Sequence, residues 1–121
     1  MKVLIVEDHV DAREMLMTLL ELQGMETQGA ATGLEAVDMI QTWRPDAAVI
    51  DFVLPDIDGC ELARRVRNQL ERRDMVLMAL TGHSDERAAA AAAEAGFDHF
   101  FVKPIDPEAV IRTLRQARDT R

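Results

Sequence analysis

Several features that define other classes of protein are scarce or missing in this sequence. Cys60 is the only cysteine, which excludes an intramolecular disulfide and a cysteine-rich zinc site and favours a reducing compartment. The opening apolar run, residues 1–6, is far too short for a membrane span or a signal-peptide core, and Glu7 and Asp8 follow at once. We therefore expect a cytoplasmic protein.

Basic side chains are also in deficit. The chain has 14 lysine and arginine residues against 22 aspartate and glutamate residues, which gives a formal net charge of -8. A chain of this charge is poorly suited to holding a phosphate backbone or an anionic lipid surface. We expect no direct contact with nucleic acid or with membranes.

The length and composition indicate one globular domain. The 121 residues are enough to close a hydrophobic core but too few to divide into two domains. Apolar residues make up 48% and charged residues 30%, both near the globular average. Since no Ser/Gly-rich linker or charge block interrupts the chain, we predict a single domain over residues 1–121.

Short apolar runs alternate with segments of helical periodicity along the whole chain. The pattern predicts strands at 2–6, 25–30, 47–52, 75–80 and 99–102, and helices at 9–23, 34–43, 59–70, 85–95 and 107–118. Strands that are continuously apolar, rather than alternating, are typical of parallel sheets. The sequence thus predicts an α/β fold in which helices cover both faces of a five-stranded parallel sheet.

Charged and hydroxyl side chains follow four of the predicted strands. Glu7 and Asp8 follow the first strand, Asp51 ends the third, Thr81 the fourth and Lys103 the fifth. Ligands bind where the carboxyl ends of parallel strands meet. An acidic residue after a strand is more often a helix cap or turn former, but three crowded carboxylates repel one another unless a cation joins them. Their hard oxygen atoms favour magnesium, with manganese as the alternative, over zinc.

Asp51 is the best placed of these groups for chemistry. A carboxylate beside a divalent metal can attack phosphorus when the transferring oxygens are neutralised and held in line. The ammonium of Lys103 and the hydroxyl of Thr81 would supply charge and hydrogen bonds to those oxygens. The residues themselves therefore point to phosphoryl transfer onto Asp51.

The segments that hold these residues, VLIVED, DFVLPDIDG, LTG and FFVKP, resemble the receiver domain family of two-component response regulators. The likeness covers essentially the whole chain. It implies a flavodoxin-like (βα)5 fold with strand order 2-1-3-4-5. It also implies that Asp51 accepts a phosphoryl group, that Thr81 and Lys103 bind that group, and that magnesium is bound by Asp8, Asp51 and the backbone carbonyl of Val53, with Glu7 assisting through water.

The resemblance extends to switching and to partners. It implies that the ring of Phe100 turns inward when Thr81 moves toward the phosphoryl group, and that the Lys103-Pro104 bond is cis, although a trans turn is the plainer reading. The donor would be a histidine kinase or a histidine phosphotransfer protein. The domain would catalyse only its own phosphorylation and slow dephosphorylation. Its output would be a downstream protein partner or an attached output domain; both stay open, as does homodimerisation of the phosphorylated form.

Three alternatives compete with this interpretation. A phosphatase of the haloacid dehalogenase type needs a second aspartate two residues after the first, where this chain has Val53. A flavodoxin-like cofactor protein needs a first loop that binds phosphate, and the acidic residues there would repel one. A degenerate receiver would act as an interaction module without phosphorylation. The presence of all key residues argues against this alternative. Val53 and His83 are expected to flank the site and to affect the lifetime of the phosphoryl group.

Overall fold

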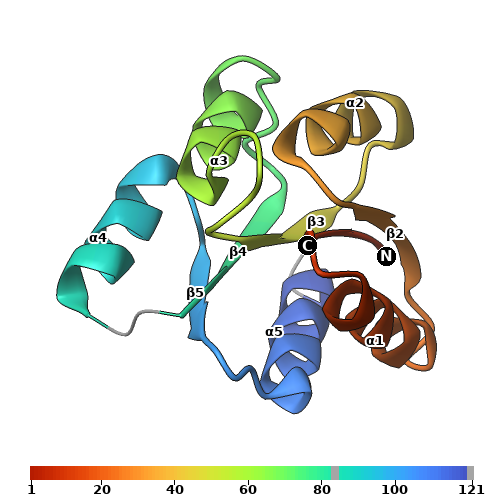
Figure 1. The fold of residues 1–121 in the computed structure, drawn as a ribbon. Helices are drawn as coiled ribbons and strands as arrows, with labels where there is room; N and C mark the ends of the chain where they lie inside the picture. The colour runs from red at the N-terminus through yellow and green to blue at the C-terminus, as the bar shows by residue number, and fades with distance from the viewer. Residues whose placement is uncertain (83–84, 120–121) are drawn as a thin grey trace.

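Five parallel strands form one sheet in a computed structural model that describes residues 1–82 and 85–119 (Figure 1). The strands are β1 Lys2–Val6, β2 Glu26–Ala30, β3 Ala47–Asp51, β4 Val76–Thr81 and β5 His99–Val102. The helices are α1 Val10–Glu21, α2 Gly33–Trp43, α3 Gly59–Asn68, α4 Glu86–Ala95 and α5 Pro107–Asp119. The strand order is β2-β1-β3-β4-β5, so the predicted order is confirmed.

The sheet has an apolar layer on each face. Successive strand side chains point to opposite faces, so Leu4 and Val6 of β1 join one buried cluster, while Val3 and Ile5 join the other. Helices α2, α3 and α4 cover the first face through residues such as Ile40, and α1 and α5 cover the second (Figure 1). The predicted arrangement with helices on both faces is confirmed.

Strand β2 departs from the expectation of continuously apolar strands. Its sequence is ETQGA, and its residues alternate between exposed and half-buried up to the buried Ala30. The reason is its place at the edge of the sheet, where it pairs with β1 alone. An edge strand needs little apolar character because solvent reaches it.

The helix boundaries follow capping side chains. Asp58 accepts a hydrogen bond from the backbone N–H of Glu61 at 2.8 Å and so caps the start of α3. Thr32 and Asp85 begin α2 and α4 in the same way. Most predicted segments were a residue or two too long at an end, because cap residues share the local sequence pattern without helical geometry.

Within the described residues, no helix combines the length and apolar character needed to cross a membrane.

Candidate functional site

The carboxyl ends of the strands open onto one acidic cavity. β1 ends just before Glu7, and Asp51 is the last residue of β3. Asp51 lies beside Leu80 in the sheet, which places Thr81 just beyond it on β4. The cavity has a volume of about 420 Å³ and is lined by Glu7, Asp8, His9, Asp51, Val53, Gly82 and Lys103. The parallel topology thus brings together the acidic residues and the lysine predicted from the sequence.

Asp51 is the centre of the hydrogen bonds in this cavity. It is buried, with 5% of its surface exposed. Its Oδ1 accepts the backbone N–H of Val53 at 3.1 Å, and its Oδ2 accepts the ammonium of Lys103 at 2.6 Å. Both bonds orient the carboxylate and stabilise its charged form.

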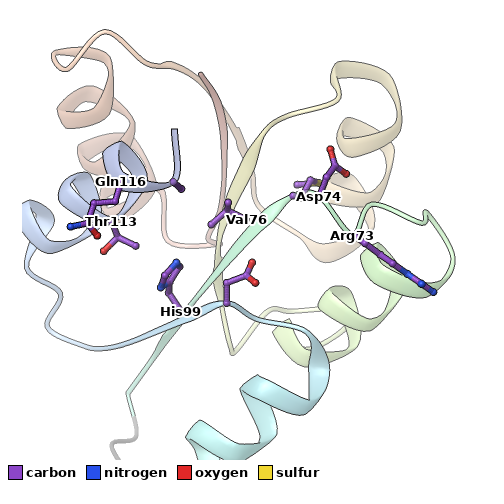
Figure 2. Close-up of a pocket in the computed structure, with 9 residues that line it drawn as sticks. Arg73, Asp74, Val76, His99, Thr113 and Gln116 are labelled. Carbon is purple, nitrogen blue, oxygen red and sulfur yellow. The ribbon is translucent and has the colours of Figure 1, made fainter. Parts of the chain in front are cut away.

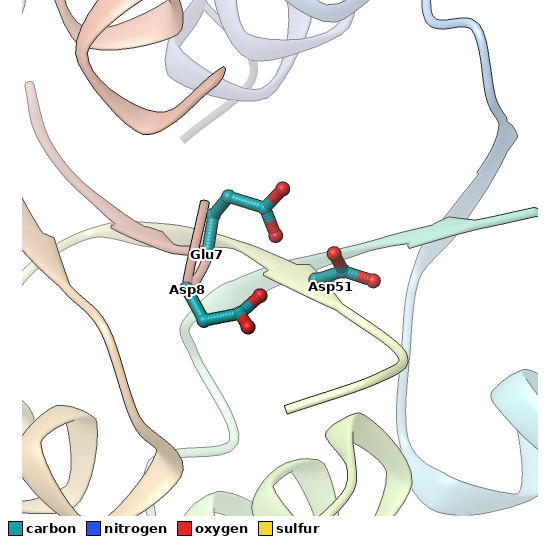
Figure 3. Close-up of side chains that lie close together, drawn as sticks. All are labelled: Glu7, Asp8 and Asp51. Atoms are coloured by element: carbon teal, nitrogen blue, oxygen red, sulfur yellow. The ribbon is translucent and has the colours of Figure 1, made fainter. Parts of the chain in front are cut away.

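Glu7 and Asp8 complete an acidic trio with Asp51. Figure 3 shows the three carboxylates gathered in one space, and one oxygen of each lies within 4.8 Å of the others. Glu7 is buried, whereas Asp8 is exposed to solvent. The ammonium of Lys103 lies 3.7 Å from Glu7 Oε1. The ammonium of Lys103 therefore lies close to both buried acids, Glu7 and Asp51.

The pKa values of Glu7 and Asp51 diverge because burial, hydrogen bonds and neighbouring charges act on the two carboxyl groups to different extents. Burial, then the hydrogen bond and charge of Asp51, raise the pKa of Glu7 to about 8. Burial also acts to raise the pKa of Asp51, but hydrogen bonds from Glu7, Lys103 and the Val53 N–H outweigh it and lower that pKa. Burial acts to lower the pKa of Lys103, and the Asp51 carboxylate more than compensates and raises it. At neutral pH, Asp51 is therefore ionised while Glu7 holds a proton.

The donor atoms of this trio fit a divalent cation. All are carboxylate oxygens, the ligands that magnesium prefers. Glu7 Oε2 is buried and has no hydrogen-bond partner among the described residues, which is a costly state for a polar atom. A cation, with the water that it carries, would satisfy this oxygen and relieve the repulsion that raises the Glu7 pKa.

Known proteins resemble this chain in sequence over almost its whole length. Residues 3–115 match the family described as the response regulator receiver domain. The chain belongs to the response regulator receiver domain family. It is 34% identical over 116 residues to an uncharacterized 14.6 kDa protein of Leptolyngbya boryana, covering 96% of this chain and 88% of that one. It is also 34% identical over 115 residues to the response regulator MprA of Mycobacterium avium, covering 95% of this chain but only 50% of that protein.

Solved structures show the same fold. The chemotaxis response regulator CheY4 of Vibrio cholerae has a TM-score of 0.89 and 30% identity, with 96% of this chain and 97% of that one covered. The CheY-like receiver domain protein of Methanospirillum hungatei has a TM-score of 0.90 and 27% identity, with 98% and 94% covered. Receiver domains are signalling domains of two-component systems, and this chain spans about half the length of relatives such as MprA.

The remaining residues predicted from the sequence lie around the receiver site. Thr81 is 1% exposed at the end of β4, and its carbonyl accepts the backbone N–H of Lys103 at 2.7 Å. The Lys103-Pro104 bond is cis. Phe100 is half-buried, and its ring packs edge-on against Phe52 with centroids 6.0 Å apart. Val53 is 73% exposed on the cavity wall. His83 lies outside the described residues.

Sequence reasoning missed two side chains that hold the loops of the site. Arg13 Nη1 donates to the main-chain carbonyl of Glu7 at 2.8 Å. The carboxylate of Asp56 accepts the N–H groups of Gly33 and Leu34, both at 2.9 Å, and so joins the loop after β3 to the start of α2. Neither contact follows a sequence motif. The one sequence signal for the Arg13 contact is Gly29, a glycine within β2 that leaves space for the Arg13 side chain.

A second pocket lies near the other end of the sheet and lacks this convergence. Its volume is about 360 Å³, and its lining comes from the segments before β4 and β5 and from α5. Figure 2 shows that its polar residues do not point to a common centre: Arg73 and Asp74 lie on one side and His99 and Thr113 on another. The pocket offers no cluster of groups comparable to that at Asp51.

Proposed function

We propose that the receiver domain spans residues 1–121 and is a phosphorylation-dependent switch that accepts a phosphoryl group on Asp51. The observation that carries the proposal is the state of the Asp51 carboxylate. It is ionised, buried and hydrogen-bonded to Lys103 at 2.6 Å. It lies at the carboxyl end of β3, on the wall of the acidic cavity, where an incoming group has access. A charged carboxylate held in one orientation is a competent nucleophile toward phosphorus.

The transfer assigns a role to each residue. An oxygen of Asp51 forms the new bond to phosphorus as the phosphorus–nitrogen bond of a phosphohistidine donor breaks, and the bonding electron pair leaves with the imidazole. Lys103 gives up its ionic contact with Asp51 and binds a phosphoryl oxygen instead, and Thr81 binds another phosphoryl oxygen. Asp8, Asp51 and the carbonyl of Val53 would hold a magnesium ion, with Glu7 acting through water. When bound, magnesium neutralises charge on the transferring oxygens, a role that manganese can also fill.

Signalling follows from a local rearrangement. The added charge and acceptor oxygens favour one of two arrangements of nearby segments. Thr81 moves toward the phosphoryl group, and the ring of Phe100 turns inward, away from the edge-on contact with Phe52 described above. The surface of α4 and β5 changes as a result.

The switch needs a phosphoryl donor and an output. The donor is a histidine kinase or a histidine phosphotransfer protein, and the output is a protein partner or an attached output domain, with dimerisation of the phosphorylated form as one route. The domain itself catalyses only its own phosphorylation and dephosphorylation. We place the reaction in the cytoplasm, where the Cys60 thiol stays reduced.

The test is the intact mass of the protein after incubation with acetyl phosphate. We expect a labile gain of one phosphoryl group in the wild type that requires magnesium and is absent in Asp51→Asn. A folded wild-type protein that gains nothing, from acetyl phosphate or from a phosphorylated histidine kinase, would instead be a phosphorylation-independent interaction module.

A further inference from the structure

The turn that carries Glu7 and Asp8 leads into α1 through a weak helix cap. The N-cap of α1 is His9, whose Nδ1 accepts the N–H of Ala12 at 3.3 Å in an exposed position. The N-caps of α2, α3 and α4 are threonine or aspartate, with bonds of 3.1, 2.8 and 2.8 Å. Histidine is not among the preferred capping residues. The cap alone therefore fixes this turn poorly.

Arg13 supplies a second restraint on the same turn. The carbonyl of Glu7, to which its guanidinium donates, belongs to the peptide unit that joins Glu7 to Asp8. The N–H of Glu7 is bonded to the carbonyl of Ala30 in β2 at 3.0 Å. Both polar groups of the Glu7 backbone are thus held, one by the sheet and one by Arg13. Their combined effect is to fix the plane from which the two acidic side chains project.

Gly29 leaves the space that the Arg13 side chain needs to reach the Glu7 carbonyl. It lies within β2, where glycine weakens a strand and carries no side chain to pack. Its backbone does not have a positive φ, so conformation does not explain it. A Cβ at this position would lie 2.8 Å from Arg13 Cδ and 2.9 Å from Met17 Sδ. The glycine therefore provides the space in which the Arg13 stem crosses β2.

We propose that Arg13 is a positioning residue of the receiver site: through its bond to the Glu7 carbonyl, it holds Glu7 and Asp8 in the orientation that binds the divalent cation. This inference rests on the proposed function. A simple charge role predicts the opposite effect, because a guanidinium near the trio repels a cation. Loss of Arg13 weakens cation binding if the residue positions the acids and strengthens it if the residue acts only by charge.

The experiment is a titration with Mn2+ followed by electron paramagnetic resonance, which measures the free ion and needs no phosphorylation. Arg13→Met keeps the apolar stem and the helix propensity but removes the donor and one positive charge. Gly29→Ala keeps the guanidinium but displaces its stem. Arg13→Lys restores a charged donor. Arg112→Met, at an exposed site on α5, is the matched control for the loss of charge.

We expect Arg13→Met to bind Mn2+ about tenfold more weakly, a typical cost of losing a group that orients metal ligands. Gly29→Ala also binds more weakly, Arg13→Lys lies closer to the wild type than to the methionine variant, and Arg112→Met is unchanged. Thermal denaturation checks that each variant is folded; should Gly29→Ala not fold, the comparison of methionine with lysine at position 13 decides.

Unchanged or tighter Mn2+ binding by Arg13→Met, beside a wild type that binds, would overturn the positioning role and leave the proposed function intact. A folded wild type that neither binds Mn2+ nor gains a phosphoryl group would overturn the proposed function and this inference together.

Discussion

Lys103 and Arg67 are cations at opposite ends of one sheet, and their surroundings satisfy them to different degrees. All five N–H groups of Arg67 donate hydrogen bonds, which join the end of α3 to the segments before β4 and β5. The acceptors are the carbonyls of Gly96, Arg72 and Met75 and the carboxylate of Asp98. Lys103, by contrast, pairs with two carboxylates, those of Asp51 at 2.6 Å and Glu7 at 3.7 Å, and its side chain is 38% exposed.

The two ends of the sheet therefore differ in how completely their polar groups are paired. Each N–H donor of Arg67 has an acceptor, and these contacts stabilise the native fold. At the Lys103 end, the Glu7 Oε2 atom is left without a described partner and the pKa of Glu7 rises to about 8. Groups with perturbed pKa values concentrate at functional sites, where incomplete satisfaction leaves capacity for a ligand. Substitutions at the two ends should therefore have different effects on stability and on cation binding.

Arg67→Met should have the largest effect on stability. It removes all five hydrogen bonds of the guanidinium, to three carbonyl groups and to Asp98, so we expect the free energy of unfolding to fall by about 3 kcal/mol. Urea denaturation measures this loss. Arg64→Met is the matched control, because Arg64 is exposed on the same helix and forms a surface ion pair with Glu61 at 3.5 Å; its cost should stay below about 0.5 kcal/mol. Equal losses in both variants would show that the Arg67 network is not special.

Magnesium should stabilise the protein through the Lys103 end alone. At a free concentration ten times its dissociation constant, the ion adds about 1.4 kcal/mol to the free energy of unfolding. Asp51→Asn should lose most of this gain, whereas Arg67→Met should keep it despite its lower stability. A gain of the same size in Asp51→Asn would place the ion elsewhere.

Glu7→Gln should remove a pH dependence of the stability. The pKa of Glu7 is about 8 in the folded protein against 4.5 for the free group, so the folded state holds the additional proton between these values. Stability attributable to Glu7 therefore falls as pH rises from 4.5 to 8. Without divalent ions, the variant should be more stable than the wild type by about 1 kcal/mol at pH 8 and should show a flatter profile.

Urea denaturation between pH 5 and pH 8 measures this difference. Glu14→Gln, at an exposed position on α1, is the control that makes the same substitution away from the acidic trio. Parallel profiles for Glu7→Gln and the wild type would contradict the assignment of the proton to Glu7.

The same comparison marks the limit of sequence prediction. Strand and helix order, the parallel sheet and the placement of Asp51, Thr81 and Lys103 at strand ends all follow from periodicity and topology. The sequence did not separate the buried Glu7 from the exposed Asp8, because adjacent acidic residues look alike until the turn between β1 and α1 is known. Contacts with backbone carbonyls, such as those of Arg13 and Arg67, depend on the path of a long side chain and leave no sequence pattern.

Asp56→Ala should give the smallest effect, on a loop of the receiver site. Burial acts to raise the pKa of Asp56, but the N–H groups of Leu34 and Gly33 outweigh it and lower that pKa. Its contribution is therefore present at neutral pH and is lost as pH falls through the lowered value. We expect a loss of about 0.5–1 kcal/mol at pH 7, as for other helix caps, that shrinks toward acidic pH.

Thermal denaturation at pH 7 and pH 3 checks this prediction, with Asp56→Asn retaining part of the capping. A loss that does not change with pH would show that the charge of Asp56 has no role.

The most direct test of the central claim is to locate the phosphoryl group. Sodium borohydride reduces an acyl phosphate to an alcohol, which converts a phosphorylated aspartate into homoserine that peptide mass mapping can identify. After acetyl phosphate and magnesium, we predict homoserine at position 51 and no conversion when magnesium is left out. An intact Asp51 beside a protein that has gained a phosphoryl group elsewhere would contradict the assignment of the acidic cavity as the phosphorylation site.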